Sequence, residues 1–532
     1  MSRSLVCLKH QIGLHLLSRQ LRNAHLCLAS NYSSRSYTNH ATRKYPGMLP
    51  RVEVAPSLQE LSDFPKVISR QAEIESSKYR IQERPLGKCS PMRVVVIGAG
   101  ISGLNMIHTL QKQTTNVSGE WIVAVKHDVT GEVSEDRTQV LVDATGIFNE
   151  WKWPNIEGLH SFKGQLIHTA NWPRDFQHHD KTVAVLGNGA SGVQIVPAIQ
   201  PDVKKLVHFI RARLHHRARL KRMRNILGNL DEYTEFTQHI DDLSRKERFK
   251  TILNSSEQAQ SSRKAITRYM TKELRGNEEL ITALIPTTPV GCRRITGSTS
   301  YLESLAAPNV ELARSPIQEI SATGIIQESG RRIEVDAIIC ATGFNTSFVP
   351  RFPIVGENGW NLQDVWLEEN GGPKAYMSIM AEGMPNYFRF FGPNGPLAHG
   401  VVPRLSSYIC SYILAHIRKM QFEHISSVRP LPDAVEDFNE HVQAFMPRTA
   451  WAAEGCGGWY KSKTSKDGKE GRVIALHPGS QTHWEEMLSR VRWEDFEFRR
   501  QGERDRSGNR FAYLGNGFTV NEVEGDDLDQ EL

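Results

Sequence analysis

The residues that decide the fold are the apolar run 93–97 (RVVVI) and the glycine-rich stretch 98–103 (GAGISG) that follows it directly. The run predicts a short buried strand, and Leu104, Ile107 and Leu110 recur at the spacing of a helix. The first glycine allows a tight turn, the second lets a pyrophosphate approach the backbone, and the third lets helix and strand pack closely. Free N–H groups at the start of the helix then bind the phosphates. The candidate cofactor-binding residues here are Gly98, Gly100, Ser102 and Gly103.

The same pattern returns at residues 182–192, where TVAVL precedes GNGASG. Residues 206–210 (LVHFI) predict the next strand, and Arg211 follows it. An acid at this strand end binds the ribose 2′-hydroxyl of NAD, whereas a cation suits a 2′-phosphate, so NADP is favoured. The candidate binding residues are Gly187, Asn188, Gly189, Ala190, Ser191, Gly192, Arg211 and Ala212.

Two further apolar strands, 140–146 (VLVDATG) and 337–343 (AIICATG), both end in Ala-Thr-Gly. In flavoproteins with two dinucleotides, such a strand returns the chain from one domain to the next. We therefore predict an α/β protein with two Rossmann-like dinucleotide-binding domains, one for FAD and one for NADPH. The segment 225–285 is polar, with Leu, Ile and Phe at helical spacing, and predicts a helical insertion.

Composition limits the remaining possibilities. The chain has 532 residues, 39% hydrophobic and 23% charged, which is typical of a globular protein of about three domains. Residues 1–52 carry eight basic residues and no acid, so the rest has 57 basic against 59 acidic residues and gives no electrostatic case for binding nucleic acid. No apolar run approaches the roughly 18 residues of a membrane helix, so no transmembrane segment is expected.

The two ends of the chain and the cysteines bear on location. The Arg- and Ser-rich leader has the composition of a mitochondrial transit peptide, and a disordered extension or a misplaced start codon explains it equally well, so cytoplasm and mitochondrion stay open. Residues 521–532 hold six acids and no base. Seven scattered cysteines without a CxxC pair argue for a reducing compartment and against a disulfide framework or a structural zinc site, and no metal is expected.

Between the two glycine motifs lies FKGQLIHTANWP, residues 162–173. It resembles the FxGxxxHxxxW fingerprint of the Baeyer–Villiger monooxygenases, with Phe162, Gly164, His168 and Trp172 at the fixed positions. The related flavin-containing monooxygenases, which hydroxylate nitrogen or sulfur, end this motif with another aromatic residue. The resemblance extends from about residue 80 to about residue 498 and is strongest to fungal members of secondary metabolism, which implies a polyketide-type ketone as substrate. It includes the stretches 291–294, 301–303, 392–396, 458–461 and 493–495.

The resemblance implies a chemistry and roles for individual residues. In this family NADPH reduces FAD, the reduced flavin takes up O2, and the oxygen adduct attacks a ketone to give an ester or lactone. The active-site arginine of the family aligns with Arg294, a fixed cation that stabilises the developing negative charge. His168 is expected to support domain motion at a hinge. Trp459 and Tyr460 either line the substrate pocket or are ordinary core aromatics.

The first nucleotide fold departs from the family after Gln113. The strand that carries a ribose-binding acid is missing, and Glu120 precedes an apolar strand, 121–125, instead of ending one. That strand, the turn 130–132 and residues 140–143 resemble a later hairpin of the family. A skipped exon or faulty gene model is the first explanation and a real deletion the second. We expect the chain as it stands to bind FAD poorly and to expose strand edges and apolar surface.

Three alternative functions are compatible with these sequence features. The first is a Baeyer–Villiger monooxygenase acting on a small-molecule ketone and O2, the second an inactive relative that binds only NADP, and the third a flavin N- or S-hydroxylase. The predicted organisation has a leader at 1–52, an N-terminal arm at 53–92, a truncated first part of the FAD domain at 93–150, a fingerprint linker at 151–181, an NADP domain at 182–335, a second FAD part with the C-terminal region at 336–510, and an acidic tail at 511–532.

Overall fold

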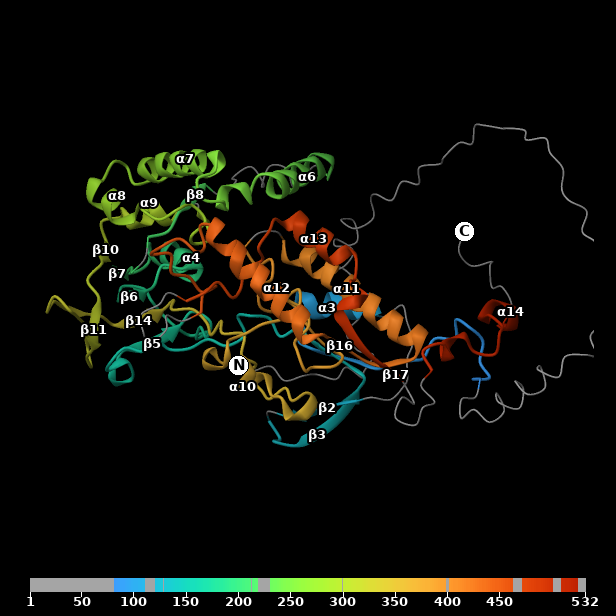
Figure 1. Cartoon of the computed structure of the whole chain (residues 1–532). Helices are drawn as coiled ribbons and strands as arrows, with labels where there is room; N and C mark the ends of the chain where they lie inside the picture. Colours follow the sequence, from blue (N-terminus) through green and yellow to red (C-terminus); the bar gives the residue numbers. More distant parts are fainter. Residues whose placement is uncertain are drawn as a thin grey trace, which may run out of the picture. The chain divides into compact units, whose positions relative to one another are not determined.

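The computed structural model describes residues 81–110, 120–127, 129–211, 213–218, 230–298, 300–398, 401–462, 471–500 and 509–524 (Figure 1). The predicted leader, most of the N-terminal arm, Ala212 and the end of the acidic tail lie outside these ranges. Among the described helices, none is long and apolar enough to cross a membrane.

The first glycine motif stands at the edge of a three-stranded parallel sheet. Its strands are β1 (Val94–Ile97), β4 (Val140–Asp143) and β15 (Tyr387–Arg389), in the order β1-β4-β15. The helix α3 (Ile101–Leu110) follows the glycine turn and packs against the long helix α11 (Val402–Glu423) (Figure 1). The strands predicted at 93–97 and 140–146 are thereby confirmed.

The second glycine motif belongs to a five-stranded parallel sheet with the order β10-β7-β6-β14-β5. Its strands are β5 (Gln165–His168), β6 (Thr182–Leu186), β7 (Lys205–Phe209), β10 (Val310–Ala313) and β14 (Ala337–Cys340). The helix α4 (Ala190–Ile199) follows the glycine turn, and α9 (Tyr301–Leu305) packs beside it. The chain is thus α/β with two Rossmann-like sheets, as predicted.

Both Ala-Thr-Gly strands lie beside a glycine strand, and this fixes the geometry of the two turns. Ala144 donates its N–H to Ile97 O at 2.8 Å, and Ala341 donates to Leu186 O at 2.9 Å. Because β14 pairs with both β6 and β5, it completes the five-stranded sheet, and the chain continues from there into other elements. The predicted limit at residue 335 places this strand in the second FAD part, whereas its pairing lies in the five-stranded sheet, and the domain bounds stay a prediction.

The predicted helical insertion is confirmed. It contains α6 (Leu230–Lys246), the 3-10 helix η3 (Lys250–Ile252), α7 (Glu257–Glu273) and α8 (Glu278–Leu284), grouped together in Figure 1. Ser256 caps α7 by accepting from the Ala259 N–H at 3.0 Å. Ile266, Met270 and Leu274 bury their side chains in the core of the five-stranded sheet, so the insertion is anchored by packing.

The region after α3 differs from the predicted hairpin. β2 (Trp121–Lys126) pairs antiparallel with β3 (Val133–Thr138), whereas residues 140–143 form β4 in the first sheet. The full apolar run of β4 is buried, which explains why β4 joins the core sheet and not the β2–β3 ribbon.

The smaller sheets are β8 (His216–Ala218) with β9 (Thr296–Ser298), β11 (Ile317–Ile320) with β12 (Gly324–Gln327) and β13 (Arg332–Glu334), and β16 (Ile425–Pro430) with β17 (Phe496–Arg500). The remaining α-helices are α10 (Leu362–Val365), α12 (Pro432–Phe445), α13 (Gln481–Ser489) and α14 (Val520–Glu524).

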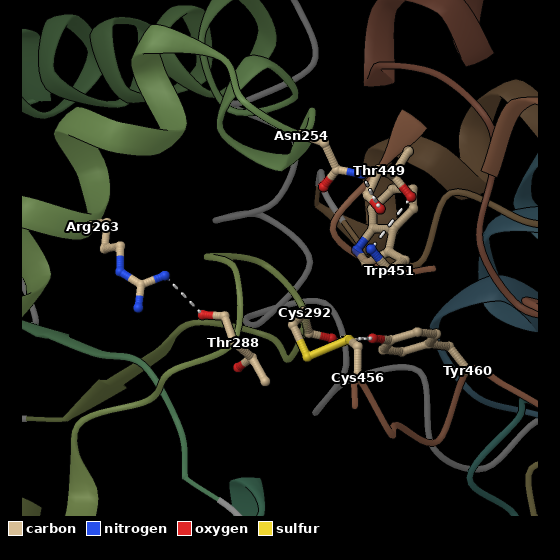
Figure 2. Close-up of a disulfide and its surroundings, with 8 residues drawn as sticks. All are labelled: Asn254, Arg263, Thr288, Cys292, Thr449, Trp451, Cys456 and Tyr460. Atoms are coloured by element: carbon tan, nitrogen blue, oxygen red, sulfur yellow. Dashed lines mark hydrogen bonds between the residues drawn. A yellow bond between two sulfur atoms is a disulfide. The ribbon is translucent and has the colours of Figure 1, made fainter. Parts of the chain in front are cut away.

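Two cysteines correct the prediction made from cysteine spacing. Cys292 and Cys456 form a disulfide across a separation of 164 residues, with their Cα atoms 5.6 Å apart (Figure 2). The argument against disulfides rested on local spacing, and a bridge between distant loops leaves no local pattern. Cys89, Cys340 and Cys410 are free thiols.

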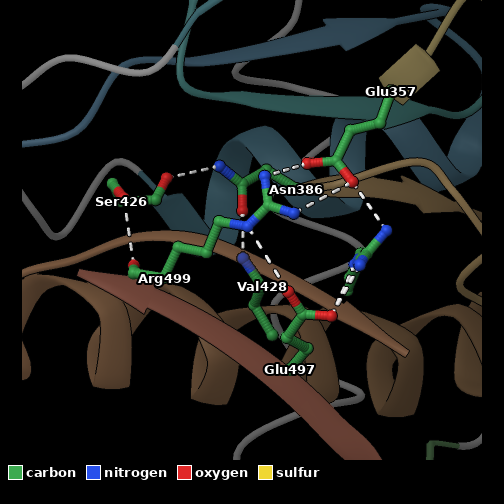
Figure 3. A network of polar contacts seen from close by, with 7 residues as sticks. Glu357, Asn386, Ser426, Val428, Glu497 and Arg499 are labelled. Atoms are coloured by element: carbon green, nitrogen blue, oxygen red, sulfur yellow. Dashed lines mark hydrogen bonds and ion pairs between the residues drawn. The ribbon is translucent and has the colours of Figure 1, made fainter. Parts of the chain in front are cut away.

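An ion-pair network joins the β16–β17 ribbon to residue Glu357. Arg429 contacts Glu357 and Glu497, each at 2.6 Å, and Arg499 pairs with Glu357 as well (Figure 3). Asn386 adds backbone bonds by accepting from Val428 N at 2.8 Å and donating to Ser426 O at 2.9 Å. The network fixes the ribbon next to the end of the first sheet.

A buried charge pair lies within the first sheet itself. Arg389 on β15 lies 3.5 Å from Asp143 at the end of β4, and both side chains are almost fully buried. Tyr387 donates its hydroxyl hydrogen to Asp143 at 2.9 Å. Burial, together with the negative charge of Asp143, raises the pKa of the Tyr387 phenol well above its usual value, so the phenol remains a donor.

Candidate dinucleotide and substrate site

The two glycine turns have the same local geometry. Gly98 and Gly187 adopt φ of 115° and 99°, and a Cβ there would lie 2.4 and 2.8 Å from the carbonyl oxygens of Ala144 and Ala341. A Cβ at Gly103 or Gly192 would lie 2.0 or 2.1 Å from the carbonyl oxygen of the first glycine of its own turn. The first and the third position of each turn therefore require glycine, because a side chain there would collide with the neighbouring backbone.

The middle glycines have the opposite surroundings. Nothing lies within 4 Å of a Cβ built at Gly100 or at Gly189. This open space at the start of a helix is where a pyrophosphate would approach the backbone. Of the other predicted loop residues, Ser102 and Asn188 are buried, Ser191 is half-buried and Ala190 is exposed.

Arg211 lies where the sequence predicts the 2′-phosphate contact. It follows the carboxyl end of β7, which pairs with β6, and Gly187 donates its N–H to Phe209 O at 2.9 Å. The side chain of Arg211 is exposed. The second turn and this exposed cation thus fit a dinucleotide that carries an additional phosphate.

The first turn fits only part of FAD. Its open side at Gly100 suits a pyrophosphate, yet among the described strands β1 pairs with β4 alone, so no neighbouring strand end supplies an acid for the ribose. Ile101, Leu104 and Ile107 of α3 are exposed by 51, 56 and 41%. Within the described residues, the predicted open strand edge and exposed apolar surface are both present.

The fingerprint residues are held by packing. Phe162 is buried, and a Cβ at Gly164 would lie 2.5 Å both from the Phe162 ring and from the Asp336 carbonyl oxygen. The Phe-x-Gly part of the motif therefore closes the linker onto the start of β14. Trp172 is 37% exposed and packs edge-on against Phe176 at 5.4 Å.

His168 ends β5 and is buried in an aromatic cage. Its ring stacks on Trp151 at 4.7 Å and meets Trp153 and Phe344 edge-on. Nδ1 accepts the Ala170 N–H at 3.1 Å. Burial lowers the pKa of His168, and a backbone hydrogen bond at Gly343 partly opposes this. A neutral, stacked imidazole suits support of the chain between the domains, and the hinge role stays a prediction.

Arg294 lines a pocket with the predicted aromatic residues. The pocket, with a volume of about 50 Å³, also contains Trp459 and Tyr460, as well as Leu397, which follows β15 of the first sheet by way of the Gly-Pro-Asn-Gly-Pro turn. Ile97 at the end of β1 and Leu141 of β4 belong to one apolar cluster with the pocket residues Leu397 and Trp459, so the pocket adjoins the first sheet. Arg294 itself is exposed.

Contacts around the disulfide fix the walls of this pocket. The Tyr460 hydroxyl donates to the Cys292 carbonyl oxygen and lies 3.0 Å from Cys456 Sγ (Figure 2). Burial raises the pKa of Tyr460, which keeps the phenol protonated. The loop that carries Arg294 is thus joined to the loop of Trp459 by a covalent bond and a hydrogen bond.

Two further arginines were missed by sequence reasoning. Arg248 lines the same pocket as Arg294, and Arg293 lies beside Gly457, 3.7 Å from a Cβ placed there. Burial, followed by the charges of Arg294 and Arg217, lowers the pKa of Arg248 to about 10. Burial also lowers the pKa of Arg293, with a smaller contribution from Arg211. Arg248 sits in a charged stretch of the insertion that has no motif, so only its placement in the fold reveals it.

Comparison with known proteins agrees with this geometry. A family described as flavin-binding monooxygenase-like matches residues 106–358. The FAD-binding monooxygenase tazF of Aspergillus terreus is 35% identical over 433 residues, 78% of this chain and 75% of that protein. A Baeyer–Villiger monooxygenase of Streptomyces coelicolor is 30% identical over 386 residues, 68% of this chain and 69% of that protein.

Solved structures share the fold. The crystal structure of OTEMO in complex with FAD and NADP aligns with a TM-score of 0.64 at 22% identity, over 77% of this chain and 100% of that one. Cyclohexanone monooxygenase from Rhodococcus, bound to NADP+, aligns with a TM-score of 0.62 at 20% identity, over 78% and 100%. With its paired glycine turns and its fingerprint linker, the chain belongs to the flavin-binding monooxygenase-like family.

Proposed function

We propose that this protein is a monooxygenase, dependent on FAD and NADPH, that inserts one atom of O2 beside a ketone carbonyl to give an ester or lactone. The observation that supports this most is the pocket that Arg294 shares with Trp459 and Leu397, two residues that pack in one apolar cluster with Ile97 and Leu141 of the sheet that bears the first glycine turn. Relatives named Baeyer–Villiger monooxygenase support the same reaction.

The residues that would hold the cofactors follow from the two turns. Gly187–Gly192 and Arg211 would hold NADPH, and Gly98–Gly103 would hold the pyrophosphate of FAD. When bound, FAD supplies the reactive form of oxygen that O2 alone does not provide.

Arg294 contributes a fixed positive charge. As the ketone is attacked, negative charge builds up on its carbonyl oxygen, and the guanidinium group stabilises it through its rigid fork of donors. Apolar neighbours such as Trp451, Trp459 and Leu476 make much of the pocket wall non-polar, which strengthens that interaction. The disulfide beside Arg294 limits movement of its loop.

The resemblance to fungal enzymes of secondary metabolism supports a polyketide-type ketone as the substrate. The fungal relatives include FAD-binding monooxygenases of Dothistroma septosporum and Emericella nidulans, 33 and 32% identical. The ending of the fingerprint in Trp172 and Pro173 supports ketone oxygenation over N- or S-hydroxylation.

A second candidate function is supported by one observation. Within the described chain β1 pairs with β4 alone, and no second strand beside β1 carries the acid expected to bind the FAD ribose. A protein with this first domain would bind NADP through its second turn and carry no flavin. It would then be an inactive relative of the oxygenases.

Purification of the full chain tests both. A yellow protein that oxidises NADPH and converts a neutral aryl ketone to its ester, followed by mass spectrometry, supports the first function. Arg294→Ala should lower ester formation by about 10²–10³-fold, whereas Arg314→Ala, at an exposed site outside the pocket, should not. A colourless protein that still binds NADPH supports the second, and oxygenation of amines or sulfides alone would overturn both.

A further inference from the structure

Arg248 is a second guanidinium in the pocket of Arg294. It lies in the connection between α6 and η3 and is half-buried. The helix η3 contributes the polar Thr251 to the wall, whereas Ile252, Leu397 and Leu476 make much of the rest apolar. None of the described residues that line the pocket is Asp or Glu.

The backbone that carries Arg248 is fixed in place. Thr251 donates its hydroxyl hydrogen to Arg248 O at 2.6 Å. Ala450 donates its N–H to Ile252 O at 2.8 Å, and Asn254 donates to Thr449 O at 3.1 Å (Figure 2). These hydrogen bonds join η3 to the segment of Trp451, which forms another wall of the pocket. The backbone from which the Arg248 side chain extends therefore has a defined position.

Two other arginines, Arg294 and Arg217, act electrostatically on Arg248. Burial and the nearby charges of Arg294 and Arg217 disfavour its protonated form, although at a pKa of about 10 it stays charged at neutral pH. In the described chain no carboxylate forms an ion pair with it. Two cations that share an apolar pocket without a counter-ion are stabilised when an anionic group enters between them.

We propose that Arg248 is a specificity-determining residue that, beside Arg294, binds an anionic oxygen, a carboxylate or an ionised phenol, on an otherwise apolar aromatic ketone. This rests on the proposed function, because it concerns the substrate of the same pocket. Trp451 and Trp459 suit a planar aromatic body better than a sugar phosphate. Arg211, placed for the NADP phosphate, does not line this pocket. A volume of about 50 Å³ accommodates one small group and leaves the remainder of a substrate outside.

The test is a binding titration of the full chain, with tryptophan fluorescence as the readout because Trp451 and Trp459 line the pocket. The probes are 4-acetylbenzoate and its methyl ester, an aryl ketone with and without the anionic oxygen. The wild type should bind the carboxylate about tenfold more tightly than the ester. Arg248→Met should remove this preference while the affinity for the ester stays unchanged. Arg268→Met, on the exposed face of α7, is the matched control and should bind both probes as the wild type does.

Two further measurements keep the outcome unambiguous. NADP+ should bind Arg248→Met as it binds the wild type, and a loss of NADP+ affinity with the carboxylate preference retained would assign Arg248 to the dinucleotide and overturn the proposal. Arg248→Lys keeps the charge, so it should retain part of the preference, and this variant decides if Arg248→Met does not fold. A wild type that binds both probes equally also overturns it, whereas failure to oxygenate the neutral ketone bears on the proposed function alone.

Discussion

The sulfur of Cys292 is bonded to that of Cys456, so the residue two positions before Arg294 is covalently joined to the loop of Trp459. A cross-link over 164 residues restricts the unfolded chain far more than the folded one. The bond therefore contributes both to global stability and to the fixed position of the pocket wall.

Replacing the disulfide should destabilise the protein. Cys292→Ser with Cys456→Ser should lower the free energy of unfolding by about 2–5 kcal/mol, measured by urea denaturation without reductant. Dithiothreitol should shift the wild type towards the double variant and leave the double variant unchanged. Cys89→Ser, at an exposed free thiol, is the control and should unfold as the wild type does. Identical unfolding of wild type and double variant would contradict the prediction.

The glycines of the second turn should separate binding from stability. Gly189→Ala places its methyl group in open space, so the melting temperature should hold while the Kd for NADP+ rises by about tenfold or more. Gly192→Ala forces a methyl group to 2.1 Å from the Gly187 carbonyl oxygen and should cost about 1–3 kcal/mol. Calorimetry and an NADP+ titration on both variants check this. The reverse pattern, a stable Gly192→Ala with a destabilised Gly189→Ala, would refute the roles assigned to the two positions.

Breaking the buried pair of Asp143 and Arg389 should be costly. Arg389→Met leaves a buried carboxylate without its cation and should destabilise the protein by about 3–5 kcal/mol. Adding Asp143→Asn should restore part of this loss, because the amide carries no charge and still accepts from Tyr387. Urea unfolding of the single and double variants measures the coupling, and simple additivity would show that the pair does not interact.

His208 should make stability depend on pH. Its Nδ1 lies 3.2 Å from the Val185 carbonyl oxygen and its Nε2 lies 2.9 Å from the Tyr301 hydroxyl, and burial lowers the pKa of the imidazole to about 4. The unfolded chain takes up a proton below the ordinary value of about 6.5 and the folded chain does not, so stability falls as the pH decreases from about 6.5 to 4. At pH 5 this amounts to about 2 kcal/mol.

His208→Gln isolates this contribution, because the other buried histidines remain. The variant should lose about 2 kcal/mol less than the wild type when urea unfolding at pH 5 is compared with pH 7. Parallel losses in the two proteins would mean that His208 titrates alike in the folded and the unfolded chain.

The parts of the fold that local chemistry dictates were predictable. The sharp turn from strand to helix requires glycine at Gly98 and Gly187, and the close backbone of that turn requires it again at Gly103 and Gly192. The spacing of the glycines therefore predicts the geometry of the turn. The strands ending at Asp143 and Cys340 were recognisable because they are buried along their whole length and therefore apolar or nearly so.

What escaped prediction depends on residues far apart in the chain. The pairing of Cys292 with Cys456, of Asp143 with Arg389, and the approach of Arg248 to Arg294 leave no periodic or spaced signal. β3 was missed as the partner of β2 because its residues are mostly polar and exposed, which leaves no alternation to recognise. The role predicted for Arg294 came from the family resemblance, because its surroundings in the sequence indicate only an exposed arginine, which the structure also shows.

Among the described strands β1 pairs on one side only, and this edge, together with the exposed apolar residues of α3, determines how the protein has to be handled. Two molecules that meet at this edge can extend each other's sheet by backbone hydrogen bonds, whatever their side chains. Association of this kind would grow with concentration, so titrations belong in dilute samples whose monodispersity is checked by light scattering.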